Sequence, residues 1–174
     1  MTFWKNFFTN LDFSKQTANN DGQYSNLIQV IDYENGKLYI YSNENNFDLS
    51  EIESLCKSVG WNQRPPKRVQ LALKNSFLTI GLFYEDLDSK RMIGFGRATS
   101  DHAFHATIWD LVIDPEFQGK GLGKLLLKQL IEELRKVNIS SITLFAEAPV
   151  ISFYESLGFT TDPNYVRGMF WEPR

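Results

Sequence analysis

The residues best suited to bind a ligand form a glycine-rich turn, Gln118-Gly119-Lys120-Gly121-Leu122-Gly123-Lys124. It lies between a predicted strand over residues 106–113 and an amphipathic helix predicted over residues 122–137. Glycines permit positive φ angles, and N–H groups at a helix N-terminus bind anions. The turn therefore favours a phosphate-bearing ligand, with a plain strand–helix connector as the alternative. Its spacing is neither GxxxxGK[ST] nor the GxGxxG of dinucleotide-binding units.

Composition excludes several other classes of function. The chain has 174 residues, which fits one domain, and a net charge of −3, which gives no general attraction for nucleic acid. No apolar run approaches the roughly 18 residues that span a bilayer. The sequence therefore predicts no nucleic-acid and no membrane partner. One cysteine and two histidines argue against an internal disulfide and against a metal site.

Hydrophobic periodicity and turn residues predict the elements that hold the turn. Residues 9–26 are mostly polar, so residues 1–26 are expected to form a flexible arm and residues 27–174 the domain. A hairpin is predicted over 27–31 and 37–42, across Asn35-Gly36. A helix over 50–60, with Ser50 and Glu53 at capping-box spacing, would bury Cys56 in the core.

The remaining elements follow the same criteria. A second helix is predicted over residues 67–75, and strands over 77–84, 92–99 and 106–113. The helix over 122–137 has an apolar stripe that ends at Val137. A strand over 141–146 and a short helix over 149–157, with Val150 inward, come next. Residues 159–161 and 169–171 are expected to pair as a final hairpin.

Three segments in order resemble the GCN5-related N-acetyltransferase (GNAT) family. They are IWDLVIDP at 108–115, the turn QGKGLG, and FYESLGF at 153–159. The resemblance runs from about residue 27 to the end. It implies an α/β fold with a central mixed, mostly antiparallel sheet of six to seven strands and about four helices. It also implies an N-acetyltransferase that uses acetyl-CoA as cosubstrate and no metal.

A narrower resemblance concerns WNQRPPKRVQLAL at 61–73 and GFTTDPNYVRGMFW at 158–171. These segments look like the chloroplast and cyanobacterial arylalkylamine (serotonin) members of the family and its plastid-encoded algal members. The chain is rich in Asn and Phe and poor in Ala, as in AT-rich genomes, and its start resembles neither a signal nor a transit peptide. We therefore expect a plastid-encoded protein of the chloroplast stroma, with the cytoplasm as the alternative.

By this resemblance, the cofactor-binding residues fall in two groups. The pyrophosphate would lie on the backbone of residues 118–124, with charge added by Lys120 and Lys124. The pantetheine arm would lie along the backbone of the last three residues of the preceding strand. The full set is Leu111, Val112, Ile113, Gln118, Gly119, Lys120, Gly121, Leu122, Gly123 and Lys124.

The resemblance also assigns the catalytic roles. Asp110 is expected to be the base or to hold a water relay, and pairing at a strand edge is its structural alternative. Tyr154 is expected to protonate the leaving thiolate, with a core tyrosine as the alternative. The N–H of Val112 would polarise the carbonyl. Many members of the family have an Asn just after the strand that corresponds to residues 141–146. This chain has Glu147 there, which either faces the amine or is exposed.

The acceptor is expected to be a primary amine: an arylalkylamine, a polyamine, or a protein lysine or N-terminus. Trp61 would contact its apolar body, and Asp110 with Glu147 would favour a cation. The alternative function is a regulatory or interaction protein that binds acetyl-CoA without turnover. The oligomeric state stays open, a homodimer being the commonest soluble oligomer.

Overall fold

A computed structural model describes residues 26–43 and 47–171 of the chain. The chain divides into two compact units, Met1–Thr143 and Leu144–Arg174. The predicted arm over residues 1–26 lies outside the described residues, apart from Asn26. No helix in the described ranges has both the length and the apolar character needed to cross a membrane.

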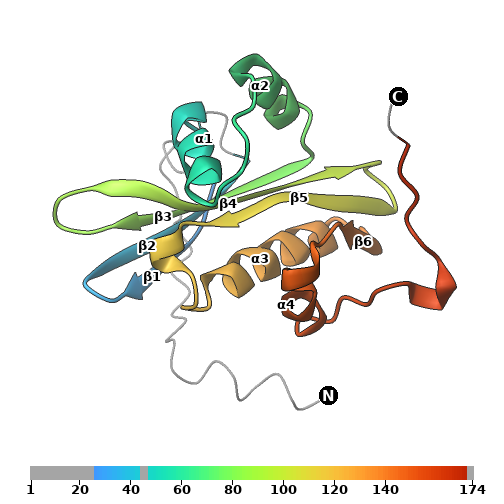
Figure 1. Cartoon of the computed structure of the whole chain (residues 1–174). Coiled ribbons are helices and arrows are strands. Elements are labelled where there is room, and N and C mark those ends of the chain that lie inside the picture. The colour runs from blue at the N-terminus through green and yellow to red at the C-terminus, as the bar shows by residue number, and fades with distance from the viewer. Residues whose placement is uncertain (1–25, 44–46, 172–174) are drawn as a thin grey trace, which may run out of the picture. The chain divides into compact units, whose positions relative to one another are not determined.

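A six-stranded sheet forms the centre of the first unit, in the order β1-β2-β3-β4-β5-β6 (Figure 1). Its strands are β1 (Leu27–Tyr33), β2 (Gly36–Ser42), β3 (Leu78–Glu85), β4 (Lys90–Ser100), β5 (His105–Ile113) and β6 (Ser141–Leu144). β1 to β5 pair antiparallel with one another in chain order. β6 lies beside the start of β5 and runs parallel to it, since Ser141 N–H bonds the carbonyl of Phe104 and Thr143 Oγ1 that of Ala106. The sheet is therefore mixed and mostly antiparallel, as predicted.

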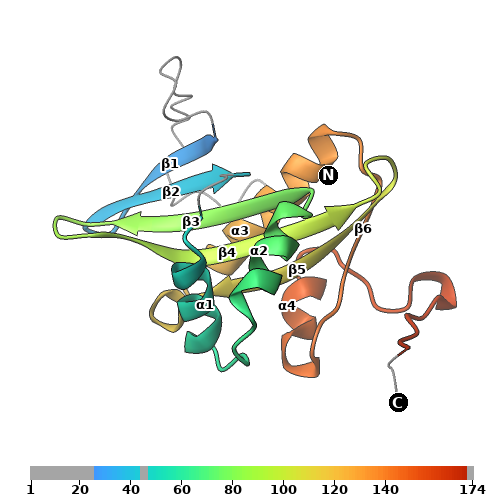
Figure 2. The same ribbon diagram turned by 90° about the horizontal axis from the view of Figure 1, so that it is seen from above.

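Helices cover both faces of this sheet (Figures 1 and 2). α1 (Leu49–Ser58) and α2 (Pro66–Lys74) lie over one face, and α3 (Leu122–Lys136) lies over the other. The apolar stripe of α3 is fully buried at Leu126, Leu130 and Leu134. On the opposite face, α1 buries its own stripe against β4 and β5, and this second cluster includes Cys56, as predicted.

Local hydrogen bonding moves several predicted boundaries. α1 begins after Asp48 and not at Ser50, because the Asp48 carboxylate accepts the N–H of Ser50 at 2.8 Å. The first hairpin turns at Glu34-Asn35, one residue earlier than expected, and Glu34 adopts a positive φ of 50°. Val137 ends α3 as its C-cap and is half exposed, so the apolar stripe stops one turn earlier.

The second unit contains α4 (Ile151–Glu155) with short 3-10 turns at Ala148–Val150 and Pro163–Tyr165. The predicted final hairpin over residues 159–161 and 169–171 is wrong: neither segment is a strand. Asp162 and Tyr165 take positive φ angles on either side of Pro163, which has no N–H to donate, so an extended ladder cannot continue. Val150, expected inward, is 43% exposed because it ends a 3-10 turn before α4 begins.

Candidate active site

A β-bulge in β5 sets the direction of Asp110. Phe95 pairs with Val112 and Arg97 pairs with Trp109, so Asp110 and Leu111 together face the single residue Gly96. Asp110 has a positive φ of 54°, a region in which Asp is one of the few tolerated residues. Strict alternation after Trp109 would turn Asp110 toward α3. The bulge instead keeps it on the face covered by α1 and α2, where Arg97 also lies.

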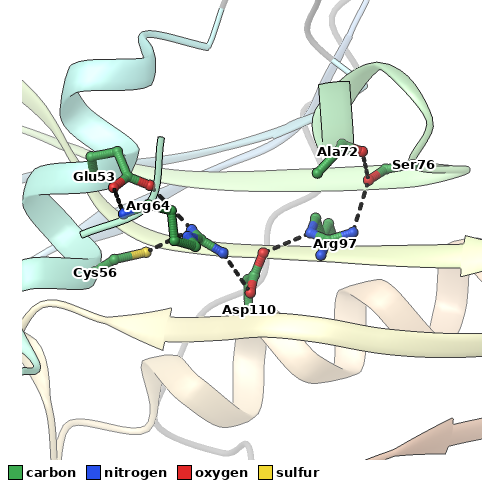
Figure 3. Close-up of polar contacts among 7 residues, drawn as sticks. All are labelled: Glu53, Cys56, Arg64, Ala72, Ser76, Arg97 and Asp110. Carbon is green, nitrogen blue, oxygen red and sulfur yellow. Dashed lines mark hydrogen bonds and ion pairs between the residues drawn. The ribbon is translucent and has the colours of Figure 1, made fainter. Parts of the chain in front are cut away.

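Two arginines hold the carboxylate of Asp110 (Figure 3). Arg97 Nε donates to Oδ2 at 2.6 Å, and Arg64 Nη1 donates to Oδ1 at 3.1 Å. The side chains of Asp110 and Arg97 are only 17% and 14% exposed. Burial lowers the pKa of Arg64, the Asp110 carboxylate raises it, and the net shift is upward. Asp110 is therefore fixed in position at a partly buried charge cluster.

The cluster extends to both helices that cover this face (Figure 3). Glu53 of α1 accepts the N–H of Arg64 at 3.2 Å and its Nη2 at 3.3 Å. Arg64 Nη2 also lies 3.4 Å from the sulfur of Cys56. Arg97 Nη1 donates to Ser76, whose hydroxyl donates to the carbonyl of Ala72 at the end of α2. These contacts tie α1, α2 and the link between them to the bulge.

A cavity of about 290 Å³ lies beside this cluster. Its polar lining consists of Asp110 and three arginines, Arg64, Arg68 and Arg97. The rest of its lining is apolar: Ile52, Pro65, Val69, Ala72, Leu73 and Phe95. The link between α1 and α2 reaches the cavity through Arg64 and Pro65, while the predicted contact residue Trp61 is not in the lining and is 39% exposed.

The glycine-rich turn leads from β5 into α3. Gly119 and Gly121 have φ angles of 74° and 83°, and a Cβ at either position would meet open space. Gly121 is the N-cap of α3 and offers no side chain to the first-turn N–H groups, which include those of Gly123 and Lys124. Gln118 Nε2 donates to the carbonyl of Ile113 at 2.9 Å, so this side chain fixes the turn to the end of β5. The first turn of α3 thus has no side-chain cap, and N–H groups at such a helix N-terminus can bind an anion.

Two observations concern the predicted cofactor residues: the ion pair of Lys120 and the length of β6. Lys120 Nζ forms an ion pair with Glu34 of the β1–β2 turn at 3.1 Å, so Glu34 partly neutralises the charge of Lys120. β6 has four residues and can pair with about half of the nine in β5, and its contacts fall at Ala106 and Thr107. The backbone edge of residues 111–113 is therefore not paired with β6. An extended ligand could add to the sheet only along such an unpaired edge.

Tyr154 and Glu147 belong to the second unit. Tyr154, on α4, is half-buried, and its ring packs edge-on against Phe153 and Phe159 at centroid distances of 5.0 and 6.0 Å. Burial raises the pKa of Tyr154, so its hydroxyl stays protonated at neutral pH. Within the described residues this hydroxyl has no hydrogen-bond partner. Glu147 is exposed at the N-cap of the first 3-10 turn.

Comparison with known proteins identifies the family of the chain. Residues 46–159 match the Acetyltransferase (GNAT) family. The chain is 51% identical over 174 residues to an uncharacterized N-acetyltransferase, ycf52, of Porphyra purpurea, with 100% of both chains covered. It is 43% identical over 151 residues to the chloroplastic GCN5-related N-acetyltransferase 2 of Arabidopsis thaliana, covering 78% of this chain and 58% of that one.

A solved structure gives the same result for the fold. The ribosomal-protein-S18-alanine N-acetyltransferase of Escherichia coli matches with a TM-score of 0.60 and 26% identity, over 71% of this chain and 78% of that one. The fold and the relatives thus define an N-acetyltransferase. The chain belongs to the acetyltransferase (GNAT) family, as its motifs predicted.

The sequence did not reveal the partners of Asp110. Arg64 and Arg97 carry no motif and Glu53 has only a capping-box spacing from Ser50, and the cluster forms because the bulge and the link bring distant segments together. The one available signal was the position of Arg64 in the link that the narrower resemblance covers. Within that link, the residue that the sequence indicated as an acceptor contact is Trp61.

Proposed function

We propose that this enzyme transfers the acetyl group of acetyl-CoA to a primary amine that binds at Asp110. The bulge in β5 supports this most strongly, because it directs Asp110 into a cavity while the next three residues keep an edge that β6 does not pair with. Bound acetyl-CoA supplies an activated thioester. Residues Leu111, Val112 and Ile113 would hold its pantetheine arm, and residues 118–124 its pyrophosphate.

Asp110 is proposed to accept the amine's proton, directly or through water. Deprotonating an alkylamine at pH 7 costs about 4 kcal/mol, so a nearby acceptor is needed. Each carboxylate oxygen of Asp110 accepts one guanidinium N–H, and an oxygen has two lone pairs, so an ammonium can still donate to it. The two arginines orient the carboxylate toward the cavity.

Tyr154 is proposed to donate the proton that the departing thiolate needs, with the N–H of Val112 polarising the carbonyl. The raised pKa and half-buried ring of Tyr154 support the donor role, since the phenol stays protonated over the physiological range. Glu147 and Trp61 are proposed to contact the acceptor. Acetyl transfer by this route uses no metal.

We also propose that the protein works in the chloroplast stroma. The support is a relative in Arabidopsis thaliana whose name places it in the chloroplast. Fractionation of intact plastids followed by immunoblotting tests this.

Thiol release from acetyl-CoA, measured with tryptamine, spermidine, a lysine peptide and a plastid protein extract, tests the activity itself. We expect release with at least one amine and an acetylated product by mass spectrometry. Acetyl-CoA binding by calorimetry without release for any acceptor would instead establish the non-catalytic alternative.

A further inference from the structure

The cavity at Asp110 has more positive than negative charge. Three arginines, Arg64, Arg68 and Arg97, line it with one aspartate. Glu53 lies outside the lining and neutralises part of Arg64. The expectation that this pocket favours a cation because Asp110 is acidic therefore overlooks the arginines.

The ion pairs of the three arginines show which guanidinium is not neutralised by Asp110. Arg64 and Arg97 are both bonded to Asp110. The guanidinium of Arg68 forms no ion pair or hydrogen bond with any residue in the described ranges. Arg68 is exposed, so its donors can be reached from solvent.

The apolar lining strengthens this effect. Ile52, Val69 and Phe95 are all at most 5% exposed. An oxyanion on the cavity side of Arg68 lies beside these buried side chains, where the effective dielectric is lower than in water, and is attracted more strongly than at an open surface. Five N–H donors in a planar fork also match the geometry of a carboxylate or a phosphate.

We propose that the acceptor amine carries an acidic group, a carboxylate or a phosphate, which binds Arg68 while the amine lies at Asp110. The inference rests on the proposed function and adds the class of acceptor to it. Arylalkylamines without an acidic group and polyamines are then the poorer substrates. A peptide N-terminus followed by an acidic residue satisfies the requirement, as does a small amino acid.

Matched acceptors test the proposal with the full chain. The peptides Ala-Asp-Ala, Ala-phosphoserine-Ala and Ala-Asn-Ala, each amidated at its C-terminus so that no other carboxylate is present, differ in charge at one position, and tryptophan with tryptophanamide forms a small-molecule pair. We expect KM for the acidic member of each set to be lower by about threefold to tenfold, since Arg68 is exposed and its contact is weaker than a buried one, with KM for acetyl-CoA unchanged. The phosphate and carboxylate arms identify which oxyanion is preferred.

Variants of α2 then assign the effect to one residue. Arg68→Gln should abolish the preference, and Arg68→Lys should restore part of it. Lys67→Gln is the matched control, because Lys67 is the neighbouring exposed cation and does not line this cavity. Equal KM values for acidic and neutral members, or a preference that survives in Arg68→Gln, would overturn the proposal.

A binding measurement separates this inference from the activity. Calorimetric titration of the same acceptors into the protein with coenzyme A needs no turnover. Tighter binding of the acidic members that Arg68→Gln removes supports the anion site even if no acceptor is acetylated. Turnover without any charge preference leaves the activity intact and refutes the anion site.

Discussion

The guanidinium of Arg64 donates a 3.1 Å hydrogen bond to the carboxylate of Asp110, although the two residues are 46 positions apart. Arg64 comes from the link between α1 and α2, and Asp110 from the bulge in β5. The contact fixes the wall of the cavity relative to the strand that carries the proposed base.

Replacing Asp110 by asparagine tests its role. We expect Asp110→Asn to lower kcat/KM at least about 100-fold, as loss of a general base does. The loss should be largest at low pH, where the amine is most protonated, and smaller as the pH rises.

The control for Asp110 is Glu133→Gln on α3. Glu133 is ion-paired and has a side chain 20% exposed, against 17% for Asp110. The Glu133→Gln substitution removes a comparably buried carboxylate and should leave kcat/KM unchanged. A kcat/KM for Asp110→Asn equal to that of the control would assign the carboxylate a purely structural role.

Gly121→Val should weaken acetyl-CoA binding at least about tenfold, because a side chain would enter the space where the pyrophosphate is expected. Gly60→Val provides a matched control. Gly60 has a φ of 84°, against 83° for Gly121, and a Cβ there also meets open space. Both variants should lose about 1–2 kcal/mol of stability from strain. Calorimetric titration should show weaker binding for Gly121→Val alone; equal affinities would remove the turn from the cofactor site.

Tyr154→Phe should lower kcat at least about tenfold with little change in KM for acetyl-CoA, because it deletes a proton donor and keeps the ring. Its melting temperature should match the wild type, since the hydroxyl bonds none of the described residues. Tyr165→Phe, at a 97% exposed tyrosine of the same unit, is the control. Steady-state kinetics at neutral pH decide the question, and full activity of Tyr154→Phe would make this residue a packing group.

Trp61→Ala should raise KM for the amine about threefold to tenfold while leaving acetyl-CoA affinity unchanged, by loss of an apolar contact. Leu87→Ala is the control, at a side chain 99% exposed in the β3–β4 turn. Kinetics with tryptamine measure both constants. A change in the cofactor constant alone would place Trp61 away from the acceptor.

Asp101 should make stability depend on pH at the acid end. Its Oδ1 accepts the N–H groups of Ala103, Phe104 and His105 at 2.8–2.9 Å, with the bond to His105 first in effect, and these bonds lower its pKa from 3.8 to about 2. The folded state therefore favours the ionised form. The resulting stabilisation is complete above pH 4 and is lost as the pH falls through about 2.

The measurement for Asp101 is urea unfolding of the wild type and Asp101→Asn at pH 7, 4 and 2. The asparagine oxygen can accept the same bonds without charge. The stability difference between the two proteins should be largest at pH 7 and shrink at pH 2. A difference that does not change with pH would show that the charge of Asp101 does not contribute.

Strong periodic patterns predicted most of the fold. The stripe of leucines in α3 and the runs of strand-forming residues in β3 to β5 place those elements within two residues of their observed bounds. Local competition changed the rest: Asp48 caps α1 in place of Ser50, and Pro163 with two left-handed residues removes the last hairpin. Single-residue hydrogen bonds and φ angles of this kind leave no periodic signal.

The candidate site was predictable only in part. The glycine-rich turn could be predicted, because the spacing of its glycines and their position before a helix are visible in the sequence. The bulge is not visible, since one extra residue in β5 changes the face of Asp110 without changing any residue type. The contacts of Asp110 with Arg64 and Arg97 depend on tertiary structure, so no sequence pattern predicts them.

The burial of Cys56 has a practical consequence for every variant described above. It is the only cysteine of the chain and is 2% exposed, and burial raises its pKa while Arg64 opposes that shift. A folded chain should therefore react slowly with disulfide reagents that report free coenzyme A, which keeps the background of the thiol assay low. The same reagent becomes a probe of folding: rapid labelling of one thiol per chain in the absence of substrates marks a variant whose α1 face has opened.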